Sequence, residues 1–330
     1  MVQAGAFGVD LFFLLSAYLI TELLVREKEL KGTLNVRMFY ARRILRIWPL
    51  YFFAIALCAG LQFVLPEQEL SLAAIAWFLL LGGNWYTALY RTPDAFISPL
   101  WSVSIEEQFY LLWPLAVRRA SITSIAWIAA ALVVAGSVAR WIFYGLVTVN
   151  TAPLFIWANT FTRLDTIGLG ILLAAISHQR PFPPVSFAIR AVSLCGGIAC
   201  WLAANELGIV LPDPSRFGVM VGYPLMTLGS LLLLLSAYGL DVQPIPRIVR
   251  TPLIYLGRIS YGLYVYHVLA FLLARLWLLR SPEDAAGKIV AVPVAFALTC
   301  AFAALSYRWL EAPFLRLKER FTVVKSRPVD

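Results

Sequence analysis

Charged residues are scarce in this chain of 330 residues: 14% are charged and 61% are hydrophobic. The mean hydropathy is +0.80. Soluble domains are ordinarily about 25% charged and about 45–50% apolar, so the composition excludes an ordinary soluble globular protein. The sequence also lacks a solenoid-type repeat, a low-complexity tail and a soluble linker long enough to separate a second domain. We therefore predict one integral domain over residues 1–330.

Residues that bind metals are equally scarce, with two histidines and four cysteines. The cysteines lie in apolar segments without the paired spacing of metal ligands, and we interpret all four as buried thiols. No Gly-x-Ser-x-Gly elbow and no Walker-type phosphate loop is present, so nothing supports a hydrolase or an ATP-driven pump. We predict no bound metal and no resident cofactor. The first eight residues hold no Lys or Arg and therefore no n-region of a cleavable signal.

What the chain has instead is apolar runs of about 17–25 residues, the length that spans a bilayer as a helix. They predict an all-α polytopic transmembrane bundle with about 9–10 membrane segments. Our candidate spans are residues 9–25, 48–65, 72–81, 101–117, 122–138, 164–176, 187–204, 217–240, 253–279 and 289–307. The run at 72–81 is short, and Gly82-Gly83-Asn84 follows it. We expect a re-entrant or broken piece between 71 and 117, because irregular backbone at membrane depth is tolerated where it lines a cavity.

The net charge of +9 arises mainly from basic residues in short loops between the apolar runs. Such loops face the cytoplasm in membrane proteins, so the charge reports orientation and not nucleic-acid binding. We place the loop after the first span and the Arg247/Arg250 loop in the cytoplasm. The tail at 316–330, also basic, should be cytoplasmic as well.

The first motif that carries polar groups into apolar sequence is Gly8-Val9-Asp10-Leu11-Phe12-Phe13-Leu14-Leu15-Ser16. Asp10 begins an otherwise apolar helix. A carboxylate in the first helical turn is stabilised by the helix dipole and needs no function. A functional role for Asp10 stays open beside that interpretation.

The second motif is Tyr40-Ala41-Arg42-Arg43-Ile44-Leu45-Arg46, next to the second span. Arg42 and Arg46 share a helix face, and Arg43 points to the side. Arginine binds phosphate through bidentate hydrogen bonds. From spacing alone we favour the simpler alternative, a cluster that sets topology and contacts anionic lipid.

The third motif runs from Leu100 to Tyr110 and contains the adjacent carboxylates Glu106 and Glu107. Helical spacing places Ser102, Glu106 and Tyr110 on one stripe, with Glu107 about 100° away. An interfacial position would explain the two acids. We favour function, because ionisable groups inside a membrane usually face a cavity or a partner.

Two further segments combine polar and apolar residues. In Thr162-Arg163-Leu164-Asp165-Thr166, Arg163 and Asp165 are two residues apart and cannot face each other on a helix, so we expect partners elsewhere, with Glu106 as one candidate for Arg163. A positional salt bridge is the alternative. In the segment 257–267, Ser260, Tyr264 and His267 share one stripe of an apolar helix.

A closing phrase, Trp309-Leu310-Glu311-Ala312-Pro313-Phe314, follows the last span. The simplest interpretation is a helix stop set by Pro313, with Glu311 holding nearby arginines. His178 lies in a polar loop beside Gln179, and we interpret it as solvated.

Together these motifs, in this order, resemble the membrane acyltransferase 3 family, which moves acyl groups onto sugars and other hydroxyl acceptors. The resemblance implies that Arg42, Arg43 and Arg46 bind the phosphates of cytoplasmic acyl-coenzyme A. The resemblance makes phosphate binding, and not contact with anionic lipid, our preferred interpretation of these arginines. The candidate site residues that follow are Asp10, Glu106, Glu107, Arg163 and His267 as catalytic, and Trp101, Ser102, Tyr110, Asp165, Ser260, Tyr264 and Glu311 as structural or cavity-lining.

The family's phrase around Asp10 follows a helix that bears an essential His. Only seven residues precede Gly8 here, and none is His. We expect either that an upstream helix exists before Met1 or that the chain is a degenerate relative, and we favour the upstream helix. The chain starting at Met1 is predicted to be inactive.

The resemblance implies an O-acyltransferase of the bacterial cytoplasmic membrane that moves an acyl group, most simply acetyl, from acyl-CoA to a hydroxyl of a polysaccharide or lipid-linked glycan. The expected partners are therefore membrane lipid, acyl-CoA and the glycan acceptor, and no nucleic acid. The alternatives are a polytopic transporter, which broken helices and midplane charges would suit, and a non-catalytic relative in a glycan-export complex.

Overall fold

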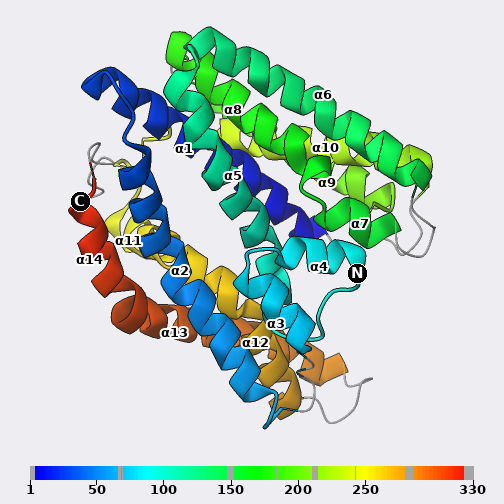
Figure 1. The fold of residues 1–330 in the computed structure, drawn as a ribbon. Coiled ribbons are helices and arrows are strands. Elements are labelled where there is room, and N and C mark those ends of the chain that lie inside the picture. Colours follow the sequence, from blue (N-terminus) through cyan, green and yellow to red (C-terminus); the bar gives the residue numbers. More distant parts are fainter. Residues whose placement is uncertain are drawn as a thin grey trace. The chain divides into compact units, whose positions relative to one another are not determined.

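The computed structural model describes residues 4–65, 68, 70–146, 152–180, 182, 185–209, 215–241, 243–278 and 285–322. Over these ranges the chain is helical and contains no strand (Figure 1), which confirms the predicted all-α class. It divides into two compact units, the first comprising Met1–Val36, Asn84–Arg91 and Gln108–Asp241, and the second Arg37–Gly83, Thr92–Glu107 and Val242–Asp330. The single domain over residues 1–330 remains a prediction.

The main helices of the first unit, within the described residues, are α1 (Gly8–Lys31), α6 (Ile122–Leu146), α8 (Leu164–Gln179), α9 (Phe187–Glu206) and α10 (Arg216–Ala237). Shorter elements join them: η1 (Ala4–Phe7), most of α4 (Gly83–Leu89), α7 (Ala152–Ala158) and η3 (Phe161–Arg163). The helix α5 (Trp101–Arg119) belongs to this unit from Gln108 onward and to the second unit up to Glu107.

The second unit is built from α2 (Val36–Leu61), α3 (Leu72–Leu79), η2 (Ser98–Leu100), α11 (Arg247–Arg258), α12 (Ser260–Leu278), α13 (Ala285–Ser306), the π-helical turn η4 (Tyr307–Glu311) and α14 (Ala312–Glu319). The predicted span 253–279 is therefore wrong as one segment. Ile259 separates two helices there, and only α12 is both long and apolar. Residues 323–330 of the predicted tail lie outside the described part of the chain.

Seven helices among the described residues are long and apolar enough to cross a membrane, which supports a multi-pass membrane protein. They are Gly8–Lys31, Val36–Leu61, Ile122–Leu146, Phe187–Glu206, Arg216–Ala237, Ser260–Leu278 and Ile289–Glu319. The expected spans at 72–81, 101–117 and 164–176 are not among them. The helices α3 and α8 have 8 and 16 residues, short of the roughly 20 that a bilayer requires, and α5 carries two adjacent glutamates.

Small residues set the packing of α8 in the first unit. A Cβ atom at Gly170 would lie 2.3 Å from the carbonyl oxygen of Leu14 in α1, and one at Gly168 would lie 2.8 Å from that of Ala129 in α6. Helices in membranes associate closely where glycine lets their backbones approach. Two glycines two residues apart thus hold α8 against α1 on one side and α6 on the other.

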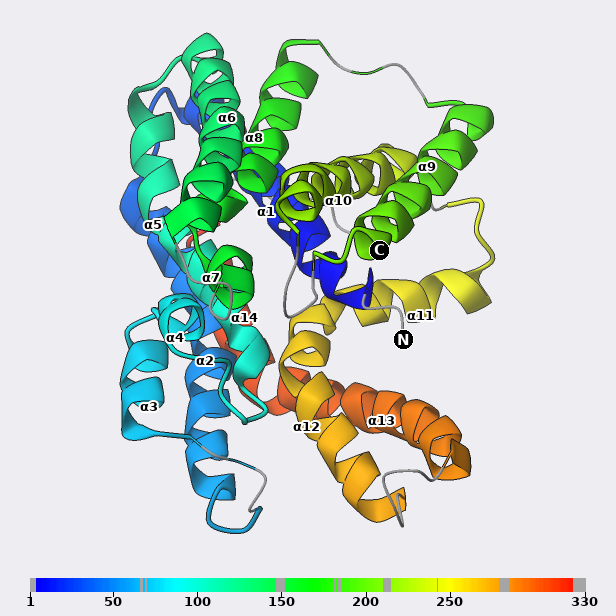
Figure 2. The ribbon, with the colours of Figure 1, turned by 90° about the vertical axis from the view of Figure 1, so that its right-hand side faces the viewer.

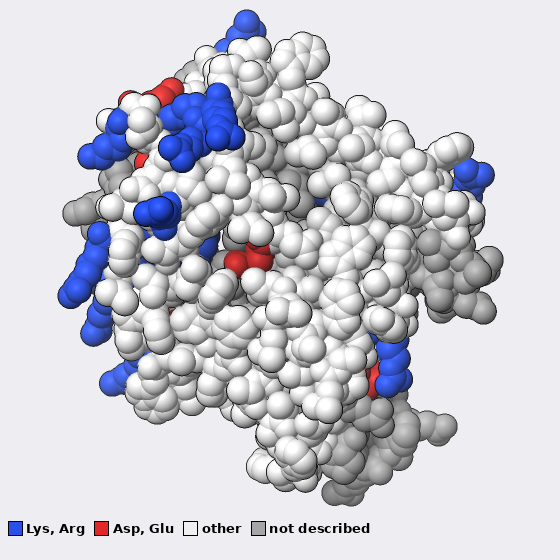
Figure 3. All heavy atoms as spheres, in the orientation of Figure 1, with Lys and Arg blue, Asp and Glu red and all other residues white. Residues whose placement is uncertain are grey.

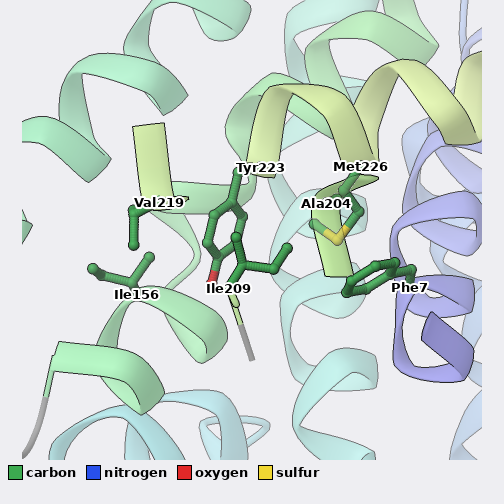
Figure 4. Close-up of a cluster of buried hydrophobic side chains, with 7 residues drawn as sticks. All are labelled: Phe7, Ile156, Ala204, Ile209, Val219, Tyr223 and Met226. Atoms are coloured by element: carbon green, nitrogen blue, oxygen red, sulfur yellow. The ribbon is translucent and has the colours of Figure 1, made fainter. Parts of the chain in front are cut away.

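A cluster of buried apolar side chains lies beside this packing in the first unit (Figure 4). It consists of Phe7, Ile156, Ala204, Ile209, Val219, Tyr223 and Met226. The cluster draws on η1, α7, α9 and α10, so it joins elements that are far apart in the sequence. Tyr223 supplies its largest polar side chain and is 1% exposed.

The expected break after residue 71 is present in the structure. The helix α3 ends at Leu79, and Leu81 has a φ of 57°, a left-handed conformation that a side chain disfavours. The carbonyl oxygen of Phe78 accepts a hydrogen bond of 2.8 Å from the Tyr51 hydroxyl, and the Gly83 amide donates to Ser104 at 3.1 Å. Side chains of α2 and α5 therefore satisfy the backbone where the helix is interrupted.

Replacement of Gly170 tests the packing of α8. We expect Gly170→Ala to lower the stability of the folded protein by about 1–3 kcal/mol, because the added methyl group overlaps the Leu14 backbone. Thermal unfolding in detergent measures this loss. Gly145→Ala in α6 is the matched control, since no atom lies within 4 Å of its added Cβ. Equal melting temperatures for the two variants would contradict the close α1–α8 contact.

Candidate functional site

A buried ion pair joins two of the predicted site residues in the first unit. The Nη1 atom of Arg163 lies 3.1 Å from Oδ1 of Asp10 and 3.3 Å from Oδ2. Both side chains are at most 1% exposed. Thr166 of α8 adds a hydrogen bond of 3.2 Å to Oδ1 of Asp10 and a second contact of 2.9 Å to Thr227 of α10. Asp10 is thus more than a first-turn carboxylate facing solvent.

The rest of the Arg163 guanidinium binds the end of α7. Its Nε and Nη2 atoms donate to the carbonyl oxygen of Trp157 at 2.9 and 2.7 Å. Neighbouring carbonyls of the same helix end accept hydrogen bonds from Thr162, which binds Ile156, and from Asn84, which binds Ala158. A helix end normally leaves its last carbonyls unpaired. Here side chains satisfy three of them, which fixes the turn that presents Arg163.

Asp165 has a different partner, as its spacing from Arg163 predicts. The Nη2 atom of Arg140 in α6 lies 2.7 Å from Oδ2 of Asp165, and Nη1 donates to the carbonyl oxygen of Thr162 at 2.7 Å. Both guanidinium groups lie over the ring of Tyr223, at 5.3 Å for Arg140 and 4.9 Å for Arg163. Two acids and two arginines therefore form one buried group with no net charge.

Our sequence interpretation missed Arg140, although a signal for it existed. A single arginine within the apolar stretch 122–146 meets the same criterion that drew attention to Glu106, since ionisable groups at membrane depth are costly and need partners. Arg140 is 1% exposed.

In the second unit, the predicted acids of α5 lie beside α12. The hydroxyl groups of Ser102 and Tyr264 are 2.6 Å apart, and Glu106, which is 4% exposed, interacts electrostatically with Tyr264. Glu107 accepts a hydrogen bond of 2.9 Å from the indole of Trp48 in α2. The stripe predicted for Ser102 and Glu106 therefore faces tyrosines of α12.

Tyr261 connects these acids to a third. Its phenol group lies within electrostatic range of Glu106, Glu107 and Glu311, and its hydroxyl donates to the carbonyl oxygen of Ile47 at 3.2 Å. Glu311 is 5% exposed and also interacts with the charge of Arg46. Three carboxylates from α5 and η4 thus lie within electrostatic range of one tyrosine of α12.

The predicted arginines of α2 meet the C-terminal helix. Nη1 of Arg42 donates to the carbonyl oxygen of Phe321 at 2.8 Å, and the charge of Lys318 interacts with those of Arg42, Arg43 and Arg46. In Figure 3, Lys and Arg side chains lie where Figure 1 draws α14 and the beginning of α2, and others lie where it draws the end of α1, while most of the visible face carries no charge. Sequence reasoning missed Lys318 because 272 residues separate it from Arg46.

The remaining predicted residues take varied positions. His267 is exposed on α12, with Nδ1 2.6 Å from the carbonyl oxygen of Tyr264, and Ser260 is exposed as well. Trp101 is buried. Tyr110 lies 2.5 Å from the hydroxyl of Ser16 within the first unit. The structure pairs Asp10 with Arg163, and it groups Glu106 with Tyr264 in the other unit.

Within the described ranges, no group of three or more His, Cys, Asp or Glu residues could hold a metal ion. A polar interior is nevertheless present in each unit. The first is charge-balanced, and the second combines buried carboxylates and tyrosines with a cluster of cations. Such a combination can bind a phosphorylated ligand at one end and move a proton at the other.

Comparison with known families gives this arrangement a context. Residues 1–308 match the acyltransferase domain model of the acyltransferase 3 family. The chain belongs to this family. The match confirms the resemblance that the motifs carry, and Lys318 lies beyond its end.

Two relatives named O-acetyltransferase OatA, from Staphylococcus aureus strains NCTC 8325 and COL, are 28% identical to the chain over 339 residues, covering 94% of it and 53% of their own length. A provisionally named O-acetyltransferase of S. aureus strain COL is 27% identical over 357 residues, covering 99% of the chain and 55% of that relative. The chain thus spans about half the length of these curated relatives. No solved structure matches it significantly.

Removing one partner of the buried pair should destabilise the first unit strongly. We expect Arg163→Gln to cost about 3–5 kcal/mol, because it leaves the Asp10 carboxylate buried without its cation. Asp10→Asn in the same chain should restore much of that loss, since no buried charge remains unpaired. Melting temperatures of the two single variants and the double variant measure the coupling. Additive losses in the double variant would show that the two side chains do not interact.

Proposed function

We propose that the protein is an O-acyltransferase of the bacterial cytoplasmic membrane. It takes an acyl group, most simply acetyl, from acyl-CoA and places it on a hydroxyl of a polysaccharide or lipid-linked glycan. Family membership supports acyl transfer, and relatives named O-acetyltransferase support the acetyl group and an oxygen acceptor. The glycan acceptor rests on the resemblance of the motifs.

One observation carries the proposal: in the second unit, the cations of α2 and α14 lie within electrostatic range of one another and of two carboxylates. Arg43 interacts with the charge of Glu107, and Arg46 with that of Glu311, while Lys318 interacts with both arginines. Coenzyme A is an anion rich in phosphate, which arginine binds in bidentate fashion. A donor held by these cations would bring its thioester toward the acids and tyrosines of α5 and α12.

The reaction itself requires one proton transfer and one oxyanion. The acceptor hydroxyl attacks the thioester carbonyl, a C–O bond forms, and the C–S bond breaks. The hydroxyl proton passes to a base and then to the departing thiolate of coenzyme A. Glu106 and Glu107 are the carboxylates of α5 that would accept it. The Tyr264 hydroxyl donates to the carbonyl oxygen of Pro99 at 2.7 Å, and it would exchange that hydrogen bond for one to the developing oxyanion.

Two further groups that could donate to the oxyanion already have other partners. The amide of Gly83, at the backbone break, already donates to Ser104. Arg163 donates to Asp10 and to the end of α7. We assign Asp10 and Arg163 a structural role in the first unit, because their hydrogen bonds fix α1 against η3 and α8.

Donor binding tests the basic cluster. We expect Arg43→Gln and Lys318→Gln each to weaken acetyl-CoA binding roughly tenfold, the effect of losing one hydrogen bond between charged groups. Isothermal titration in detergent measures it, and added salt should weaken wild-type binding in the same direction. Arg119→Gln, an exposed charge at the end of α5, is the control. Unchanged affinity in both cluster variants would remove the donor assignment.

Transfer tests the carboxylate. The test uses the protein expressed from its own gene. We expect Glu106→Gln to lower the rate of acetyl transfer by about 10²–10⁴-fold, because a general base is lost. Acetyl-CoA affinity should stay unchanged. Full transfer by this variant would exclude Glu106 as the base. No transfer by the wild type, together with transport of a solute, would favour the transporter alternative.

A further inference from the structure

None of the residues of helix α11 is buried, whereas the helices before and after it in the sequence, α10 and α12, each bury several residues. Ile248 is 83% exposed and Leu253 is 56% exposed, so large apolar side chains project from it without packing on the second unit. The helix also carries three arginines and no acidic residue. Exposed apolar patches of this kind usually mark a surface that contacts a membrane or a protein.

The two kinds of residue lie on opposite faces. At about 100° per residue, one face carries the apolar side chains Ile248, Val249, Leu253, Tyr255 and Leu256. The opposite face carries Arg247, Arg250, Thr251 and Arg258, with Ile254 among them. A helix with a cationic face and an apolar face is typical of segments that lie in the plane of a membrane surface.

The direction of α11 agrees with that position. Figure 2 shows it running across α12, so that the chain turns at Ile259 and does not continue one helix into the other. The helix α12 is long and apolar enough to cross a membrane. The turn at Ile259 lies directly before the first residue of this candidate span. The helix α11 therefore joins α12 at the membrane surface and runs along that surface.

We propose that α11 lies in the lipid–water interface of the cytoplasmic leaflet, with its apolar face among the upper acyl chains and its arginines at the phosphates of anionic lipids. Charge complementarity selects this occupant, because the helix offers three cations and no anion to the headgroup layer. The apolar face then needs no protein partner. This assignment is independent of acyl transfer.

Spin labels measure the depth of each face. The complete chain, with Cys195, Cys200 and Cys300 replaced by Ser, is labelled at single cysteines introduced as Leu253→Cys or Thr251→Cys and reconstituted in phosphatidylglycerol–phosphatidylcholine vesicles. We expect oxygen to relax the label at 253 several-fold more than a water-soluble nickel complex does, because oxygen concentrates in lipid. The label at 251 should show the opposite preference.

Two labelled positions calibrate the scale: Val192→Cys in α9, exposed on a candidate membrane span, and Arg119→Cys at the exposed end of α5. Replacing phosphatidylglycerol by phosphatidylcholine, or introducing Arg247→Gln with Arg250→Gln, should raise the accessibility of position 253 to nickel. If the nickel complex relaxes the labels at both 251 and 253 in every vesicle, then α11 lies in water and the proposal is overturned. Low access of both reagents at 253 would show a protein partner and overturn it equally.

Discussion

The pair of Asp10 and Arg163 is the interaction on which the first unit depends. An ion buried in an apolar bundle costs several kcal/mol unless a partner and further hydrogen bonds satisfy it. Here the guanidinium group satisfies both the carboxylate and the end of α7, so one side chain determines where α1 begins relative to α7 and α8. The close approach at Gly170 allows this geometry, since α1 must come near enough for Asp10 to meet Arg163.

The buried charged group of the first unit and the basic cluster of the second unit differ in net charge, and we assign them different roles for that reason. Arg140, Arg163, Asp10 and Asp165 neutralise each other within the first unit, and such a closed group fixes structure without attracting a charged ligand. In the second unit, Lys318 adds a fourth cation to three arginines already near one another. Glu107, Glu311 and Glu319 offset part of this positive charge, and an anionic ligand would offset the remainder. The difference in balance is why we assign support to the first group and donor binding to the second.

The sequence predicts the elements better than their partners. The helical class, the interruption at Gly82-Gly83 and the separate partners of Arg163 and Asp165 follow from apolar runs and helical spacing. Lys318 and Arg140 do not follow, because residues far apart in the chain meet through packing that spacing does not encode. The division at Ile259 was missed for another reason: the apolar residues of α11 continue those of α12 in the sequence, and only their arrangement on one face distinguishes them.

The shortness of α8 is explained by what surrounds it. Its 16 residues rise only about 24 Å, less than the roughly 30 Å of hydrocarbon in a bilayer. A helix facing lipid at that length would expose polar backbone at its ends. Most of α8 is buried, because α1 packs against its face at Gly170 and α6 packs against its face at Gly168. Its N-terminal residues Asp165 and Thr166 therefore meet protein groups, which is how a first turn rich in polar side chains is tolerated inside an apolar bundle.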